Sequence, residues 1–134
     1  MPIIVEPLTE ATYQDQQDLQ KIYRDAPDWL FAPFAGDVQL IEGCLRDGSL
    51  IAGRFNDRLL GAGRLQRQPD VWHLSQICVR KITRRRGVAE RLVNQAQKMA
   101  SQSGATLHLL APAGHLEARA LAAKLNVPLD VLPT

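Results

Sequence analysis

The sequence predicts an α+β domain in which helices cover the faces of a β-sheet. Its middle part reads as a meander of three strands, from Leu50 to Val79, joined by tight polar turns. A strongly amphipathic helix follows from about Gly87 and leads to another apolar strand near Thr106. The chain has 134 residues and neither a linker nor a low-complexity tract, so we expect residues 1–134 to form a single domain.

The N-terminal part of the chain predicts a short strand and two helices. Residues 3–5 are apolar and fit a strand, and Thr12 with Asp15 three residues later resembles a capping box at a helix start. The apolar face of that first helix would hold Leu19, Ile22 and Tyr23. Asp37 is expected to cap a second helix, with Gly48 just past its end. The inner face of the second helix would hold Val38, Ile41 and Leu45.

The meander consists of three expected strands and two turns. Leu50–Phe55 and residues 59–65 should form a hairpin around a tight turn at Asn56 and Asp57, because both residue types tolerate turn conformations. A Gln-Pro-Asp turn at residues 68–70 then leads into Val71–Val79. The short turns imply that these three strands are neighbours in one sheet.

The C-terminal part predicts helix, strand, helix and a final short strand. The helix that starts at Gly87 should end near residue 103, with Gly104 as its C-cap glycine. Residues 106–110 form the next strand, followed by a helix over Leu116–Leu125 and a strand over Leu129–Leu132. The buried face of the long helix would hold Val88, Leu92, Val93, Ala96, Met99 and Ala100.

Composition and charge exclude several classes of protein. The net charge is +2, from 16 basic and 14 acidic residues, so overall charge does not indicate a nucleic-acid partner. Two cysteines, Cys44 and Cys78, do not make a disulfide framework. The N-terminus does not resemble a signal peptide, and no apolar run reaches the roughly 18 residues of a membrane span. We therefore expect a cytoplasmic protein that does not bind membranes.

Basic residues gather where the third strand of the meander ends and the long helix begins. Arg84, Arg85 and Arg86 directly precede that helix. Its first N–H groups and its dipole favour an anion, and Gly87 and Ala89 are small enough for a phosphate to approach the backbone. One alternative is that these arginines are simply solvent-exposed, but positive charge is unfavourable at the N-terminus of a helix unless an anion binds there. A second alternative is a nucleic-acid site, but no aromatic residue lies nearby in the sequence to stack on bases. The segment therefore predicts a binding site for the diphosphate group of a nucleotide.

The pattern Arg84-x-x-Gly87-x-Ala89 matches the Q/R-x-x-G-x-G/A signature of the GNAT N-acetyltransferase superfamily. It also lies between a strand and a helix, as in that superfamily, which the chain therefore resembles. The resemblance implies the acyl-CoA N-acyltransferase fold, with a mixed, mainly antiparallel, twisted sheet and helices on both faces. It also implies acetyl-CoA or CoA as cofactor. The residues that would bind it are Ile77, Cys78, Val79, Thr83, Arg84, Arg85, Arg86, Gly87, Val88, Ala89 and Glu90.

Residues 18–23, 54–60 and 79–88 resemble a narrower family, the PanM/PanZ maturation factors of aspartate 1-decarboxylase. In that family the acetyl-CoA-loaded protein binds the decarboxylase precursor and promotes its self-cleavage, in the pathway to pantothenate and CoA. The resemblance implies the same role here, with Arg54 and Asn56 touching the decarboxylase. Asn56 has an alternative role as a turn residue chosen for its backbone conformation.

The alternative function is a true N-acetyltransferase that acts on a small-molecule or protein amine. GNAT enzymes often use a glutamate on the strand before the cofactor loop and a tyrosine near the last helix. Here Val71–Val79 contains no carboxylate, and both tyrosines, Tyr13 and Tyr23, lie far upstream. We therefore leave the enzymatic activity open and assign no catalytic residue. His73 and Glu117 are the candidates that remain.

The cysteines and histidines do not favour nucleophilic or metal chemistry. The thiol of Cys78 could act as a nucleophile that accepts an acetyl group. On an apolar strand, however, a cysteine is more often a small buried hydrophobic residue. The histidines, His73, His108 and His115, lack the close sequence spacing typical of metal ligands. From the sequence we expect no metal site.

Overall fold

The computed structural model describes residues 3–24, 26–81 and 87–132, and across these residues six strands form one sheet in sequence order. The strands are β1 (Ile4–Pro7), β2 (Leu50–Phe55), β3 (Arg58–Arg67), β4 (Val71–Val79), β5 (Thr106–Pro112) and β6 (Leu129–Leu132). The helices are α1 (Tyr13–Tyr23), the short 3-10 helix η1 (Asp28–Phe31), α2 (Asp37–Asp47), α3 (Val88–Gln102) and α4 (Leu116–Leu125). Strands β1 to β4 are antiparallel neighbours, whereas β4, β5 and β6 run parallel. The expected α+β fold with a mixed, mainly antiparallel sheet is confirmed.

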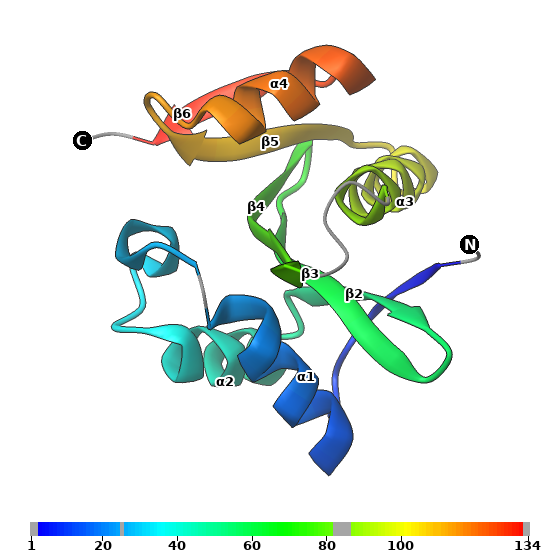
Figure 1. The fold of residues 1–134 in the computed structure, drawn as a ribbon. Helices are drawn as coiled ribbons and strands as arrows, with labels where there is room; N and C mark the ends of the chain where they lie inside the picture. Colours follow the sequence, from blue (N-terminus) through cyan, green and yellow to red (C-terminus); the bar gives the residue numbers. More distant parts are fainter. Residues whose placement is uncertain (1–2, 25, 82–86, 133–134) are drawn as a thin grey trace.

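Two hydrophobic cores lie on the two faces of this sheet. Figure 1 shows α1 and α2 together below the sheet, with β5, β6 and α4 at the opposite end. One core packs α3 residues such as Leu92 and Val93 against Trp72, Leu74 and Leu109 of β4 and β5. The other core packs α1 and α2 against β2 and β3. Within the part of the chain that the structure describes, no helix is long and apolar enough to span a membrane.

The helix termini agree with the sequence prediction except at α2. Thr12 accepts from the Asp15 N–H at the start of α1, and the Asp15 carboxylate accepts from the Thr12 N–H, so the capping box is confirmed. At α2 the N-cap is Gly36, and Asp37 is the first helical residue. Val38 is 41% exposed, so placing it on the inner face was wrong, because α2 packs on the fold through a neighbouring side of its surface. The buried residues of this helix are Leu40, Ile41 and Cys44.

Strand β4 contains one more residue than the stretch of β3 that it faces. Ala62 pairs with Cys78 and Arg64 with Ser75, so Gly63 alone lies opposite two residues of β4, Gln76 and Ile77. Gln76 has a φ of +53°, a left-handed conformation that is uncommon for a residue other than glycine. This geometry is a β-bulge, which bends a strand and increases its local twist. The bulge therefore lies just after the point where β4 stops pairing with its other neighbour, β5.

Candidate functional site

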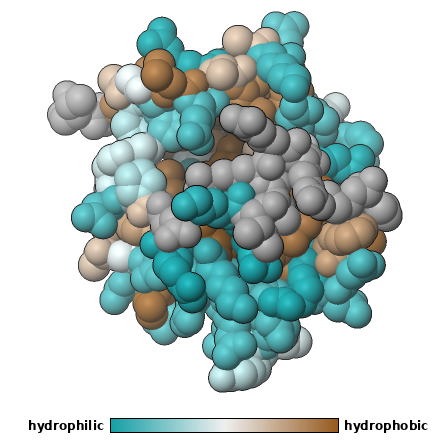
Figure 2. All heavy atoms as spheres, in the orientation of Figure 1, coloured by the Kyte–Doolittle hydropathy of each residue, from teal (hydrophilic) through white to brown (hydrophobic). Residues whose placement is uncertain are grey.

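A cleft opens where strands β4 and β5 part. Residues 71–74 pair in parallel with residues 106–109, and the described register ends at Leu74 and Leu109. Beyond that rung the two strands border a cavity of about 1080 Å³. Figure 2 shows a recess with a hydrophobic floor on this face of the molecule. An edge of β4 that lacks its strand partner offers backbone N–H and C=O groups to a ligand.

Gln76, at the bulge, forms part of the wall of this cleft and joins it to η1. Its side-chain amide donates to the carbonyl oxygens of Leu30 at 3.0 Å and Ala32 at 2.9 Å. The backbone carbonyl of Gln76 accepts a hydrogen bond of 2.9 Å from the Tyr23 hydroxyl. The Gln76 Oε1 atom is buried and has no hydrogen-bond partner among the residues that the structure describes. The cleft wall thus holds a polar acceptor that a ligand donor could satisfy.

The rim of the cleft at the start of α3 is glycine. Gly87 is the N-cap of α3, with a φ of +78°, and an added Cβ there would meet no atom within 4 Å. Val88 fits closely beside Gly61 of β3, where a Cβ would lie only 2.7 Å from Val88 Cγ1. Because Gly61 has no side chain, the N-terminus of α3 can pack close to the sheet. The first backbone N–H groups of α3 therefore lie at the cleft.

The structure brings most of the described cofactor-binding candidates to this cleft. The lining includes Ile77, Cys78 and Val79 from β4, and Gly87, Val88, Ala89 and Glu90 from the start of α3. The remaining predicted residues, Thr83, Arg84, Arg85 and Arg86, lie outside the residues that the structure describes. The assignment of all of them to a cofactor stays a prediction. The described candidates share one cleft, which is the arrangement that the resemblance implies.

The buried nucleophiles and hydroxyls near the cleft are already engaged. Cys78 is 8% exposed, and its Sγ donates to the Ile22 carbonyl at 3.1 Å. Tyr23 is fully buried, and burial raises the pKa of its phenol well above the ordinary value. Burial likewise raises the pKa of the Cys44 thiol. These groups fit structural roles better than proton or acyl transfer.

An aromatic contact crosses the cleft between η1 and the start of α4. The rings of Trp29 and His115 meet edge to face, with centroids 4.8 Å apart, and both residues line the cavity. His115 Nδ1 accepts from the Ala118 N–H and so caps α4. Glu117 also lines the cleft, as expected for a catalytic candidate. The position of Trp29 at the cleft could not be predicted from the sequence, because its contact, His115, lies far along the chain.

His73, the other catalytic candidate, is not among the described lining residues of the cleft and lies beside His108 and Asp130. Its Nε2 is 2.7 Å from Asp130 Oδ2, and the same oxygen is 2.9 Å from His108 Nδ1. The hydrogen bond from His73 outweighs burial and, with His108, lowers the pKa of the Asp130 carboxyl below its ordinary value. The expectation of no metal site was based on the wide spacing of the histidines along the chain. The fold brings His73, His108 and Asp130 together, so that spacing no longer argues against a metal site.

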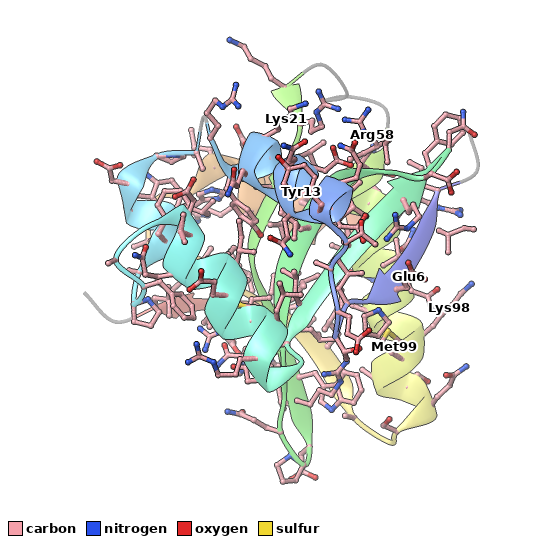
Figure 3. The ribbon with its side chains drawn as sticks, turned by 90° about the horizontal axis from the view of Figure 1, so that it is seen from below. Glu6, Tyr13, Lys21, Arg58, Lys98 and Met99 are labelled. Carbon is pink, nitrogen blue, oxygen red and sulfur yellow. The ribbon has the colours of Figure 1, made fainter. Side chains whose placement is uncertain are left out.

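Two arginines next to the β2–β3 turn are held by acidic residues of α1 and β1. Arg54 forms ion pairs with Asp15 at 3.0 Å and with Glu6 at 3.2 Å, and Arg58 pairs with the fully buried Asp18 at 2.7 Å. Figure 3 shows Arg58 and Glu6 on strands beside α1, which carries Tyr13 and Lys21. Arg54, a predicted partner-binding residue, therefore has its guanidinium engaged within the fold.

These ion pairs keep both carboxyls ionised. The hydrogen bond from Arg54 lowers the pKa of Asp15. Burial alone would raise the pKa of Asp18, but hydrogen bonds from Arg58, from the Leu59 N–H and from Gln14 outweigh it and lower the pKa. The two pairs thus attach the hairpin to α1 on both sides of its turn.

The turn itself projects Asn56 and Asp57. Both have positive φ, +49° and +64°, as a two-residue type I′ hairpin turn requires. Both are exposed, so the expected turn role of Asn56 is confirmed and its side chain is open to solvent. Contact of Asn56 with a partner stays a prediction.

Comparison with known proteins identifies relatives in sequence and in structure. Residues 2–129 match the family model described as "Acetyltransferase (GNAT) domain, PanZ". The chain is 35% identical over 95 residues to a PanD regulatory factor of Salmonella typhimurium, covering 71% of this chain and 66% of that relative. It is 30% identical over 114 residues to a PanD regulatory factor of Escherichia coli, covering 85% of this chain and 80% of that relative.

Solved structures share the fold at low sequence identity. A ribosomal-protein-alanine N-acetyltransferase from Brucella melitensis biovar Abortus superposes with a TM-score of 0.69 at 17% identity, covering 99% of this chain and 96% of that one. An aminoglycoside 6'-N-acetyltransferase complexed with coenzyme A gives a TM-score of 0.64 at 19% identity, covering 79% and 60% of the two chains. At such identities the likeness establishes the GNAT fold.

Proposed function

The chain belongs to the PanZ family of GNAT-domain proteins, and on this premise we propose that it binds acetyl-CoA and then promotes self-cleavage of the aspartate 1-decarboxylase precursor. The observation that carries the proposal is the cleft between β4 and β5, which opens beside the N-terminus of α3. The names of the two relatives, PanD regulatory factors, support a regulatory partner role.

The described residues fit a CoA-type ligand at this cleft. Gly87 leaves open space where a side chain would stand, and the start of α3 supplies N–H groups for phosphate oxygens. Residues of β4 from Ile77 to Val79 would bind the amide-bearing pantetheine arm through their backbone. Gln76 Oε1, which has no partner within the described part of the chain, offers a buried acceptor to a ligand N–H or O–H. A thioester delivered here would present its acyl end to the cavity between η1 and α4.

The lining of the cleft favours a binding role over acetyl transfer. Among the described lining residues none is a tyrosine, and the carboxylates are Glu90 and Glu117. Glu90 pairs with Lys124. His115 already uses Nδ1 to cap α4, so Nε2 is its remaining nitrogen. In this proposal the acetyl group acts as part of the ligand that completes the surface, and it is not transferred.

The surface that would meet the decarboxylase precursor is the β2–β3 turn. Asn56 projects from it, while Arg54 holds the turn against α1 through its ion pairs with Asp15 and Glu6. Arg54 would therefore contribute to binding by positioning the turn. This assignment distinguishes the two residues: the side chain of Asn56 contacts the partner, and that of Arg54 supports it.

Cofactor binding is tested by two matched glycine substitutions. Gly87→Val and Gly104→Val both place a side chain at positive φ in open space, at opposite ends of α3, so each should cost about 1–2 kcal/mol of stability. Acetyl-CoA should raise the melting temperature of the wild type and of Gly104→Val. It should have no effect on Gly87→Val. Equal stabilisation of both variants would contradict the proposed site.

The regulatory role is tested by precursor cleavage. Purified aspartate 1-decarboxylase precursor is incubated with the protein, with and without acetyl-CoA, and its two fragments are followed on a gel. Acceleration that needs both components is expected. Asn56→Gly preserves the positive φ of the turn and removes the side chain, so it should fold normally and lose the acceleration, whereas Asp57→Gly should retain it.

The proposal has two parts, acetyl-CoA binding and promotion of precursor cleavage, and a protein that binds acetyl-CoA without accelerating cleavage would separate them. In that case the cofactor site stands and the partner role is wrong. A screen of amine acceptors for acetylation then tests the N-acetyltransferase alternative. Retained acceleration by Asn56→Gly would show that Asn56 serves the turn alone.

A further inference from the structure

Three potential metal ligands meet on the sheet next to the root of the cleft. His73 of β4 and His108 of β5 are direct partners in the parallel register, so their side chains leave the same face of the sheet. Asp130 of β6 lies opposite Leu110, the next residue of β5 on that face. The face is the one opposite α3, since the neighbouring Trp72 and Leu107 point into the α3 core.

The three ligand atoms are already close to one another. Asp130 Oδ2 lies 2.7 Å from His73 Nε2 and 2.9 Å from His108 Nδ1, and all three atoms fall within 4.8 Å. A zinc ion holds such atoms at about 2.0–2.2 Å, which sets tetrahedral ligands roughly 3.3 Å apart. The carboxylate would therefore withdraw by about half an ångström from each imidazole, and the two imidazole nitrogens, which lie within 4.8 Å of each other, would adjust to the same spacing. Side-chain motion of this size is available, because Asp130 is 44% exposed.

The donor set and its exposure select the class of ion. Two imidazole nitrogens and one carboxylate oxygen suit zinc and neighbouring transition metals, whereas calcium and magnesium prefer oxygen ligands. The side chains of His73 and His108 are 18% and 23% exposed, so one side of the cluster is open to solvent. That opening gives the ion a path of entry and leaves a coordination position for water.

We propose that His73, His108 and Asp130 form a binding site for a divalent transition-metal ion of the zinc type. The ion would link β4, β5 and β6 one rung before Leu74 and Leu109, where the pairing of β4 with β5 ends. It would therefore hold the strands together at the root of the cleft. The site is separate from the described cleft lining and is independent of the proposed role in precursor cleavage.

The test is a zinc titration of protein without a histidine tag, followed by calorimetry and thermal melting. The wild type should bind one Zn²⁺ per chain and melt at a higher temperature when loaded. Asp130→Asn keeps the shape of the side chain and should weaken binding at least tenfold, as should His108→Ala. His115→Ala removes the histidine outside the cluster and should bind Zn²⁺ like the wild type.

Co²⁺ identifies the ligands independently of stability. Bound at this site it should show the visible bands of a tetrahedral nitrogen and oxygen environment, without the near-ultraviolet charge-transfer band of a thiolate. A thiolate band would assign the ion to Cys44 or Cys78 and overturn the proposal. The proposal also fails if the wild type shows no saturable binding, or if folded Asp130→Asn and His108→Ala bind as tightly as the wild type. In that case Asp130 serves only as a shared hydrogen-bond acceptor.

Discussion

The β2–β3 hairpin and the β4–β5 pair belong to one sheet, yet they are built in opposite ways. The hairpin is antiparallel and paired from its open end to its turn, and ion pairs with α1 hold it on both sides. The β4–β5 pair is parallel, stops after Leu74 and Leu109, and borders a cavity. The arginines beside the turn, Arg54 and Arg58, find partners within the fold, whereas a buried acceptor at the cleft, Gln76 Oε1, has none among the described residues.

This difference separates two tasks within one small domain. A region that satisfies its own charges keeps one shape and suits the presentation of a turn to a protein partner. A region that leaves backbone edges and a buried polar atom open suits a ligand that completes it. The proposed function needs both, because the cofactor enters at one region and the partner is met at the other.

Among the substitutions that test this difference, loss of the Asp18 carboxylate should reduce stability most. Asp18→Asn removes the charge that Arg58 and the Leu59 N–H bind, in a side chain with no exposed surface. We expect the free energy of unfolding to fall by about 2–4 kcal/mol. Urea denaturation measures it, with the exposed Glu42→Gln as the matched control. A loss no larger than that of the control would mean that the hairpin does not depend on this pair.

Acid should weaken the same region reversibly. The folded-state pKa values of Asp15 and Asp18 are lowered, so their contribution to stability is complete above the unfolded-state pKa near 3.9 and is lost as pH falls through the folded-state values. The unfolding free energy should therefore drop between about pH 5 and about pH 2. Denaturation across this range should give a shallower drop for Asp18→Asn. Parallel curves for the two proteins would contradict the assignment.

At the cleft, loss of the Gln76 side chain should act less strongly on stability and more strongly on the ligand. Gln76→Gly suits the positive φ and removes both hydrogen bonds to η1. We expect a loss of about 1–2 kcal/mol and weaker acetyl-CoA binding, because η1 is then no longer held to the cleft wall. Calorimetric titration checks the affinity. Unchanged affinity would show that η1 does not shape the ligand site.

The smallest expected effect on stability is that of Trp29→Ala. Trp29 is 46% exposed and contacts His115 edge to face, so its removal should cost under about 1 kcal/mol. Its indole should nevertheless report on the cleft. Wild-type fluorescence should change on addition of acetyl-CoA, and that change should be absent from Trp29→Ala, whose remaining indole at Trp72 is buried. A persistent signal would place the ligand away from η1.

Much of the fold could be predicted because its signals are local. The capping box at Thr12, the type I′ turn at Asn56 and the periodicity of α3 each depend on residues within a few positions. The misplaced Val38 shows the limit of that method, because Val38 and Cys44 each lie three residues from Ile41, and periodicity alone does not choose between them. Packing of α2 on the rest of the fold buries Cys44 and leaves Val38 exposed.

The contacts that the sequence did not reveal join residues far apart along the chain. Gln76 reaches a carbonyl 46 residues away, and His73 reaches an aspartate 57 residues away. His73 and His108 meet because a crossover through α3 sets the parallel register, and spacing along the chain contains no trace of that register. The cofactor segment was accessible from the sequence because strand, glycine and helix follow one another directly.

The extra residue in β4 has a consequence for anyone who wishes to transplant or redesign this strand. Before the bulge, Trp72 and Leu74 face the α3 core, whereas after it Ile77 and Val79 pack there and Cys78 belongs to the opposite core. Even-numbered positions thus serve one face in the first half of the strand, and odd-numbered positions serve it in the second. If the same nine residues were paired regularly, without the bulge, the two faces of the second half would be exchanged and Cys78 would lie against α3. Deleting Gln76 instead would remove the bulge and leave both faces as they are. A transplanted nine-residue β4 therefore keeps its two faces only if the bulge is transplanted with it.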